Sequence, residues 1–474
     1  MAAPGLDRVS ETMNDGRSLT LGPEDVAEGM RKAGIHLDQS SPYLVMVSGG
    51  PDSSFLLWAL ARLGADVVAF HLDHALRAGS ETDARAACAL AQHLGVPIEV
   101  VRRKPDVHPG ASFETAARAL RYEEAEKAAD RRGCEWILTA HTADDQVETF
   151  FINLARGAGL DGLKGIPRRS GRIVRPMLHI WKRDIRDACQ AEGISYVEDP
   201  TNLDLSLLRN KVRLRAIPVL EEVLGEGFKK SLLRQTELLR DDAEFLNAFA
   251  SSQIQSHMTR IGTHPALVAD ASWFTQLPAA IARRVVRLGF EKLAASPPPP
   301  SRLVAMALHV ADRGGIADLG NGFVFAREAK RVLLRASNLP APPPLPGTIP
   351  GEIEAPSFGV RISARRISLG SVDRHRLFDR ARSSQAVVSA SVAGAVLVRP
   401  PSPGERFSPF GLKGSKPLAD FLAERGLCKT ERLFVPVLAK PEGTIVWVVG
   451  HRISNEAAVK EGDEEALHLV SEPM

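Results

Sequence analysis

Between Tyr43 and about Leu224, short runs rich in β-forming residues alternate with longer helical stretches. The runs are YLVMVS, DVVAFHL, PIEVVR and WILTAH, and the stretches between them include SSFLLWALARLG, TDARAACALAQHLG and SFETAARALRYEEAEKAADRRG. Strands that alternate with helices favour a parallel sheet covered by helices on both faces. The pattern therefore predicts a doubly wound α/β domain over residues 39–224.

The chain of 474 residues is long enough for two to four domains. Beyond the α/β domain we predict a helical domain, a β-rich connecting region that contains a Pro-rich linker, and a small α+β C-terminal domain. A polar N-terminal extension precedes the α/β domain. The helical domain is predicted over residues 225–315, the connecting region over 316–395 and the C-terminal domain over 396–474. The N-terminal extension is predicted over residues 1–38.

The composition is that of a soluble globular protein, with 44% hydrophobic and 25% charged residues. No apolar run approaches the roughly 20 residues of a membrane span, and the N-terminus shows no signal peptide. The four cysteines stand far apart without a CxxC pair, which argues against a disulfide framework or a local metal site. We therefore expect a cytoplasmic protein. Its net charge of +3 does not by itself indicate a nucleic-acid partner.

The first strand is followed by Ser48-Gly-Gly-Pro-Asp-Ser-Ser54, which resembles a phosphate-binding loop. Gly49 and Gly50 allow a tight turn, Ser48, Ser53 and Ser54 add hydroxyl donors, and the following helix start favours anions. The lysine of the G-x-x-x-x-G-K-[ST] motif is absent. Asp52 has two interpretations, a plain helix cap or a ligand for the Mg²⁺ that accompanies ATP.

Further polar clusters follow the next strands, where ligands of open parallel sheets bind. HLDHALR contains His71, Asp73, His74 and Arg77, and ETAARALRY places Arg118 and Arg121 on one helical face. Polar loops and surface salt bridges are the plainer interpretations. The stretch TAHTADDQVETF places Asp144, Asp145 and Glu148 in the first turns of a helix, after a strand predicted to end at His141. The helix dipole alone could explain these acids, but beside a phosphate loop they favour a metal and catalytic site.

A fourth cluster lies in DPTNLDLSLLRNKVRLRAIPVL, where Arg209, Asn210, Arg213 and Arg215 recur every few positions. This spacing predicts a positively charged helical face.

Together, in this order, the motifs SGGPDS, HLDHALR, ETAARALRY, AHTADDQVETFFINLARGAGLDGLKGI, RPML and DPTNLDLSLLRNKVR resemble the tRNA(Ile)-lysidine synthetase family of PP-loop ATP pyrophosphatases. The segment from RPPSPGERF to VPVL, followed by VVGHRIS, resembles that family's C-terminal domain. Thr142 stands where the family often has a second histidine. The strong matches cover about half of the chain.

The resemblance implies an enzyme that adenylates the C2 oxygen of the wobble cytidine in an isoleucine tRNA with a CAU anticodon, and then joins L-lysine to C2. It implies ATP and Mg²⁺ as cofactors. It assigns residues 48–50, 53 and 54, with His71, Arg118 and Arg121, to ATP binding, and Asp52 and Asp145 to Mg²⁺ and catalysis. His141, Asp144 and Glu148 are then the supporting catalytic residues.

The tRNA itself is expected to contact a further set of residues, although each could be an ordinary solvated face. The set consists of His74, Arg77, Arg209, Asn210, Arg213, Lys413, Lys416 and Arg432. Two rival hypotheses are another PP-loop enzyme, such as a thiolating tRNA enzyme or an amidating synthetase, and a non-catalytic RNA-binding relic. No membrane partner is expected, and the oligomeric state is open, a homodimer included.

Overall fold

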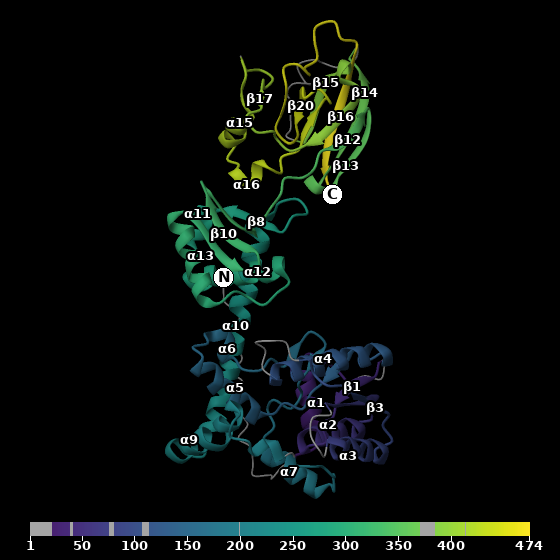
Figure 1. The fold of residues 1–474 in the computed structure, drawn as a ribbon, viewed down its shortest axis with the longest axis vertical. Coiled ribbons are helices and arrows are strands. Elements are labelled where there is room, and N and C mark those ends of the chain that lie inside the picture. Colours follow the sequence, from purple (N-terminus) through teal and green to yellow (C-terminus); the bar gives the residue numbers. More distant parts are fainter. Residues whose placement is uncertain are drawn as a thin grey trace, which may run out of the picture. The chain divides into compact units, whose positions relative to one another are not determined.

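The computed structural model describes residues 21–37, 41–74, 80–106, 113–198, 200–369, 384–412 and 414–474. Residues 1–243 and 244–474 form two compact units, and each is described here by itself (Figure 1). The division falls inside the 30-residue helix α10 (Phe228–His257).

The first unit is built on a six-stranded sheet in the order β3-β2-β1-β4-β6-β5. All neighbouring pairs are parallel except β5 with β6. The parallel α/β fold predicted from the alternating pattern is thereby confirmed. The strands are β1 (Tyr43–Met46), β2 (Val67–Asp73), β3 (Ile98–Arg102), β4 (Trp136–Leu138), β5 (Arg169–Ser170) and β6 (Ile173–Val174).

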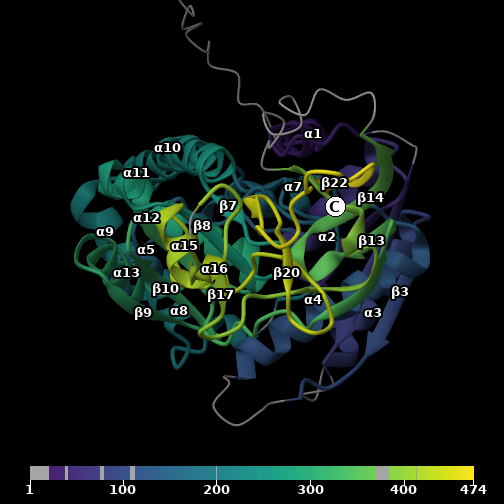
Figure 2. The ribbon, with the colours of Figure 1, turned by 90° about the horizontal axis from the view of Figure 1, so that it is seen from above.

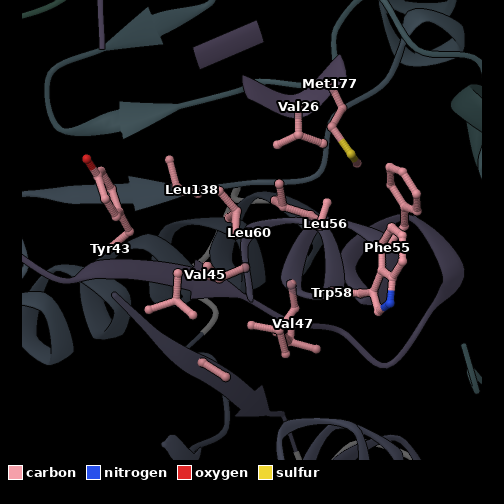
Figure 3. Packing of buried hydrophobic residues seen from close by; sticks show 14 of the residues in the cluster. Val26, Tyr43, Val45, Val47, Phe55, Leu56, Trp58, Leu60, Leu138 and Met177 are labelled. Carbon is pink, nitrogen blue, oxygen red and sulfur yellow. The ribbon is translucent and has the colours of Figure 1, made fainter. Parts of the chain in front are cut away.

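Helices cover both faces of this sheet. On β1, Val45 packs in one core cluster with Leu56 of α2 (Pro51–Arg62), as Figure 3 shows. Leu44, whose side chain points to the opposite face, packs in another cluster with Ala128 of α4 (Phe113–Arg132). Successive residues of a strand point to opposite faces, so a strand buried on both sides is apolar throughout.

The other helical segments of this unit include α3, which contacts β2 and β3 at one edge of the sheet (Figure 2). They are α1 (Pro23–Lys32), α3 (Ser80–His93), α5 (Ala143–Ala155), α6 (Leu160–Leu163), α7 (Lys182–Ala191), the 3₁₀ turn η1 (Pro200–Leu203), α8 (Leu208–Lys211), the π-helical segment η2 (Val212–Ala216) and α9 (Ile217–Leu224).

Helix α1 belongs to the core of the first unit rather than to a separate extension. Val26 and Met30 are fully buried in the same cluster as β1 and α2. Gly29 lies so close to the chain that a Cβ there would be 1.7 Å from the carbonyl oxygen of Pro176. The boundary predicted between residues 38 and 39 therefore separates α1 from its own core. Polar residues on the outer side of α1 concealed this contact in the sequence.

The second unit begins with a five-stranded sheet in the order β7-β8-β11-β10-β9. The sheet includes the hairpin predicted in GFVFAREAKRVLLRAS, in which β10 pairs antiparallel with β11. Its strands are β7 (Thr259–Arg260), β8 (Ala266–Asp270), β9 (Gly315–Gly320), β10 (Phe323–Glu328) and β11 (Arg331–Ala336). Its helices are α11 (Ala271–Gln276), α12 (Ala279–Ala294) and α13 (Ser301–Arg313). Because β8 pairs with β11, one sheet joins residues from both sides of the boundary predicted at 315/316.

Residues 345–474 form two further sheets, of orders β12-β16-β19-β20-β21 and β13-β14-β22-β15, and a short β17–β18 pair. The strands are β12 (Leu345–Ile349), β13 (Gly351–Ala355), β14 (Val360–Ser368), β15 (Gln385–Ser389), β16 (Gly394–Arg399), β17 (Arg406–Phe407), β18 (Lys416–Pro417), β19 (Val437–Ala439), β20 (Ile445–Val448), β21 (Arg452–Ile453) and β22 (Glu465–Pro473). The remaining helical segments are η3 (Pro356–Phe358), η4 (Ala390–Val392), α15 (Leu418–Glu424) and α16 (Lys429–Arg432). The pairing of β12 with β16 crosses the boundary predicted at 395/396.

In the described ranges, no helix combines the length and the apolar character that crossing a membrane would require.

Candidate active site

The loop between β1 and α2 closes on itself through serine hydroxyls. The backbone N of Ser48 donates to Oγ of Ser53 at 3.0 Å, and this Oγ donates to the carbonyl of Gly50 at 3.1 Å. Gly49 has a φ of +89°, and a Cβ there would lie 3.0 Å from a backbone carbonyl oxygen of α3. The positive φ and the close approach of α3 thus both favour glycine at position 49. Ser54 is buried in the first turn of α2, whose N-terminus favours an anion.

Asp52 lies in that same first turn, and the positive charges near its carboxylate do not offset the effect of its burial. Burial raises the pKa of its carboxyl to about 6, against the effect of Lys182, and the neighbouring carboxylate of Asp145 raises it further. The ion-pair partner described for Asp52 is Lys182, whose Nζ lies 3.8 Å from Oδ2. A cation bound at this edge of the sheet would therefore be favoured by Asp52.

Lys182 is a site residue that the sequence analysis missed. Its Nζ donates to Oδ1 of Asp145 at 3.0 Å, and its backbone N donates to Oδ2 of Asp144 at 2.8 Å. Lys182 is the first residue of α7, where the helix dipole disfavours a cation. That mismatch is the signal in the sequence that could have identified it.

Asp145 is held by four donors. Its Oδ2 accepts bonds from the backbone N and the hydroxyl of Thr142, at 2.8 and 3.0 Å. Its Oδ1 accepts bonds from Lys182 and Arg209, both at 3.0 Å. Burial alone would raise the pKa of Asp145, but the charges of Lys182 and Arg209 outweigh burial and hold it well below its usual range. Asp145 is therefore ionised and fixed in orientation.

Glu148, one turn further along α5, is bound by two arginines. Nε of Arg209 lies 2.6 Å from Oε2, and Nε of Arg213 lies 2.5 Å from Oε1. The Glu148 side chain is only 1% exposed. Arg209 and Arg213 thus share one basic helical face, as their i, i+4 spacing predicts, and this face lies against α5.

Asn210 has a structural contact rather than an exposed one. It is 6% exposed, and its Nδ2 donates to the carbonyl of Asp204 at 2.9 Å. This bond holds the loop that precedes α8. Its expected contact with tRNA receives no support from this arrangement.

His141 and Asp144 lie where β4 leads into α5. The strand ends at Leu138, three residues earlier than predicted, because the chain turns there to place Thr142 as the N-cap of α5. Nδ1 of His141 lies 2.9 Å from Oγ1 of Thr139. Burial lowers the pKa of His141 to about 3, so its imidazole is neutral at pH 7. Asp144 additionally lies 3.9 Å from Nζ of Lys229.

The histidines of β2 differ in their contacts. His71 is 4% exposed and its Nδ1 donates to the carbonyl of Val47 at 2.8 Å, so it fastens β2 to the end of β1. Both ring nitrogens of His74 are buried and have no hydrogen-bond partner among the described residues. Burial lowers the pKa of His74, and the charge of Arg121 lowers it further. Arg118 lies over the ring of Tyr122, 5.1 Å from its centroid.

The remaining expected tRNA contacts are only partly covered by the described residues. Arg77 and Lys413 lie outside the described residues. Lys416 pairs with Glu424 and lies 5.4 Å from the ring centroid of Phe421. Nε of Arg432 donates to a backbone carbonyl of the same segment at 3.0 Å. Neither contact points to a nucleic acid by itself.

The glycine-rich stretch after α5, residues 156–165, is fastened at its end. Gln146 Nε2 donates to the carbonyl of Ile166 at 2.8 Å, and Gln146 Oε1 accepts from its backbone N at 2.6 Å. Arg240 of α10 is buried and donates to the carbonyls of Lys164 and Ile166. Arg175 donates to the carbonyl of Pro167. The two bonds of Gln146 connect the loop to the residue next to Asp145.

The site therefore offers one carboxylate, that of Asp52, to a divalent cation, but not a complete set of protein ligands. Asp52 is undercompensated and would gain from a cation, whereas both oxygens of Asp145 already have partners. Among the residues that the structure describes, no group of three or more His, Cys, Asp or Glu side chains is arranged to hold a metal. A magnesium ion at Asp52 would thus have to take its other oxygen ligands from a bound substrate or water, as Mg²⁺ commonly does.

Comparisons with known proteins match both ends of the chain. A family described as the PP-loop domain matches residues 25–220, and one described as the TilS substrate C-terminal domain matches residues 396–469. The first range contains Asp52, Asp145 and Glu148. Both ranges include the motifs on which the resemblance was based.

Whole-chain relatives agree with these matches. The tRNA(Ile)-lysidine synthase of Symbiobacterium thermophilum is 32% identical and covers 94% of this chain and 93% of its own length. That of Thermobifida fusca is 39% identical over 55% of this chain and 80% of its own. That of Parabacteroides distasonis is 29% identical, with coverages of 91% and 95%.

Proposed function

Because the chain belongs to the tRNA(Ile)-lysidine synthase family, we propose that it joins L-lysine to C2 of the wobble cytidine in an isoleucine tRNA with a CAU anticodon. It is an ATP-using ligase that modifies tRNA. The modified base pairs with A rather than G, so the tRNA reads AUA.

The proposed chemistry has two steps. The C2 oxygen of cytidine attacks the α-phosphorus of ATP, and pyrophosphate leaves. The ε-amine of lysine then attacks C2 and loses a proton, and the C2 oxygen leaves as part of AMP. ATP thus converts a poor leaving group into a good one, and the site must stabilise the negative charge of the leaving phosphates.

The loop of residues 48–54 is proposed to hold the phosphates of ATP. Its support is the tight Gly49 turn and the N-terminus of α2, a combination that suits an anion. Lys182, which lies between Asp52 and Asp145, supplies a positive charge next to that loop. Arg209 also donates to Oδ1 of Asp145 and is a second candidate for contact with the phosphates.

Magnesium is proposed to be held by Asp52 with Asp145 near it. When bound, Mg²⁺ would screen the phosphate charge and orient the pyrophosphate. The raised pKa of Asp52 supports this role, since burial outweighs the positive charges near its carboxyl. Asp145 is proposed mainly to fix Lys182 and Arg209, because its oxygens are already occupied.

Lysine is proposed to enter beside α5. Asp144 can attract its ammonium group. The imidazole of His141 is neutral at pH 7 and can accept a hydrogen bond from the amine, but its low pKa disfavours its taking the proton that the amine loses. Glu148 is proposed to position Arg209 and Arg213.

The observation that carries the proposal is the convergence of Asp52, Lys182 and Asp145 within 4 Å beside a PP-loop. The test uses the purified protein, ATP, Mg²⁺, labelled lysine and a CAU isoleucine tRNA transcript. Label should enter acid-insoluble RNA only with ATP, and it should be absent with the Asp145→Asn variant. Pyrophosphate release with another amine or with a sulfur donor would overturn the substrate.

Sulfur transfer, the chemistry of the thiolating alternative, finds little support in the cysteines. The cysteine next to the loop is Cys189, whose Sγ lies 3.9 Å from the carbonyl of Pro51. Burial raises the pKa of its thiol to about 12, which keeps it protonated and unreactive. Cytoplasmic location and a homodimer stay predictions, and sedimentation velocity tests the latter.

A further inference from the structure

The segment from Leu207 to Val219 has two faces of different character. The inner face carries Arg209 and Arg213, which bind the catalytic acids, and Ile217, which is 7% exposed. On the other side lie six exposed residues, which we call the outer surface of α8–α9. They are Leu207, Leu208, Lys211, Leu214, Arg215 and Val219.

The outer surface of α8–α9 combines exposed apolar side chains with positive charge. Leu207, Leu208, Leu214 and Val219 are between 39% and 57% exposed. No acidic residue occurs in the sequence between residues 205 and 220. Several large apolar side chains gathered on one exposed face usually mark an interaction site.

Resting on the proposed function, we propose that the outer surface of α8–α9 docks the unpaired anticodon loop of the tRNA. Lys211 and Arg215 bind its phosphates, and the leucines pack against unstacked bases. Surfaces that hold single-stranded nucleic acid combine positive charge for the backbone with stacking contacts for the bases, most often from aromatic rings. Here the exposed leucines would supply the apolar contact in place of rings. An enzyme that reacts at C2 of a base must also take that base out of its stack.

The position of the outer surface relative to the acids supports this partner. The inner face of the same segment contacts Asp145 and Glu148 directly. RNA bound on the outer surface would therefore lie about one helix diameter, roughly 10 Å, from the catalytic carboxylates. An extruded nucleotide next to the docked loop can cover that distance.

A second copy of this chain is the competing occupant. A two-fold contact would place the same surface on both partners, so that Lys211 and Arg215 of both copies would lie in one interface. Within that interface these charges would repel one another, since the nearest exposed acids, Asp204 and Glu222, lie at the two ends of the surface. The phosphates of an RNA backbone would provide complementary charge along the whole surface.

The first test measures binding of a CAU anticodon stem-loop RNA to the full-length protein at several salt concentrations. The Lys211→Ala/Arg215→Ala variant should bind about tenfold more weakly at low salt, and its slope of log affinity against log salt should be smaller by about 1.5 to 2. The control, Arg131→Ala/Arg132→Ala, removes the same charge at the end of α4, where both arginines pair with Glu99. Equal affinity and slope in the two variants would overturn the proposal.

The second test addresses the apolar part. Leu207→Ala/Leu208→Ala should weaken binding about tenfold without changing the salt slope, because it removes contact with bases and not with phosphates. If instead RNA affinity is unchanged and sedimentation shows a dimer becoming a monomer, a second copy is the occupant and the proposal fails. Lysine incorporation by the unaltered enzyme is measured in parallel. Its absence would contradict the proposed function, whereas incorporation with unaffected variants would contradict only the docking surface.

Discussion

Lys182 and Asp145 form an ion pair whose Nζ and Oδ1 atoms are 3.0 Å apart, and the pair links the start of α7 to the first turn of α5. The same ammonium group lies 3.8 Å from Oδ2 of Asp52 in the phosphate loop. One cation thus connects the two carboxylates on which the proposed chemistry depends.

Replacement of Lys182 by methionine should lower kcat for lysine incorporation about 100-fold or more, because it removes the charge that we propose faces the leaving phosphates. KM for tRNA should change little. The matched control is Arg183→Met, which removes a charge from the next, exposed position of α7. Steady-state kinetics measure both variants, and equal kcat values would contradict a catalytic role for Lys182.

Replacement of Glu148 by glutamine should destabilise the first unit by about 3 kcal/mol, since it leaves Arg209 and Arg213 without their buried carboxylate. Urea denaturation followed by circular dichroism measures the change. Glu123→Gln, at an exposed ion pair on α4, should cost less than about 1 kcal/mol. Similar losses in both variants would show that the arginine pair does not depend on Glu148.

Replacement of Gln146 by alanine should loosen the glycine-rich loop. The backbone N and carbonyl of Ile166 would each lose a partner, at a cost of about 1–3 kcal/mol. Limited proteolysis should then cut residues 157–167 faster, and lysine incorporation should fall. An unchanged cleavage rate would mean that Arg240 and Arg175 suffice to hold the loop.

His451 should make the second unit sensitive to acid. Burial, aided by the charge of Arg425, lowers its pKa to about 4 from an ordinary value of 6.5. The folded state therefore binds fewer protons than the unfolded state between these values, so the free energy of unfolding falls as the pH drops from about 6.5 to 4. The loss should be on the order of 2 kcal/mol, allowing for partial exposure. His451→Gln should remove that part of the pH dependence in urea titrations at pH 7 and pH 4, and an identical dependence would contradict it.

Much of the first unit could be predicted because its signals are local. The β-forming runs and the Ser48–Ser54 motif depend on neighbours in the sequence, and the parallel sheet brings their carboxyl ends together. The sequence therefore predicted that Asp52, Asp144, Asp145 and Glu148 lie near one another, and their catalytic roles stay predictions. It did not predict Lys182, because the contacts of Lys182 are with residues far away in the sequence.

The remaining differences have the same cause. The sequence shows that Arg209 and Arg213 share a helical face, but not that this face meets α5 rather than solvent. The pairing of β8 with β11, and of β12 with β16, depends on contacts across long loops. Domain boundaries drawn from changes in local pattern therefore cut through these two sheets.

The most direct test of the central claim follows the oxygen at C2 of the wobble cytidine. A CAU tRNA carrying ¹⁸O at that position is incubated with the enzyme, ATP and lysine, and the released AMP is examined by mass spectrometry. The account predicts one ¹⁸O atom in AMP for each lysine incorporated, because that oxygen is adenylated and then leaves. Incorporation of lysine with unlabelled AMP would contradict adenylation of the cytidine.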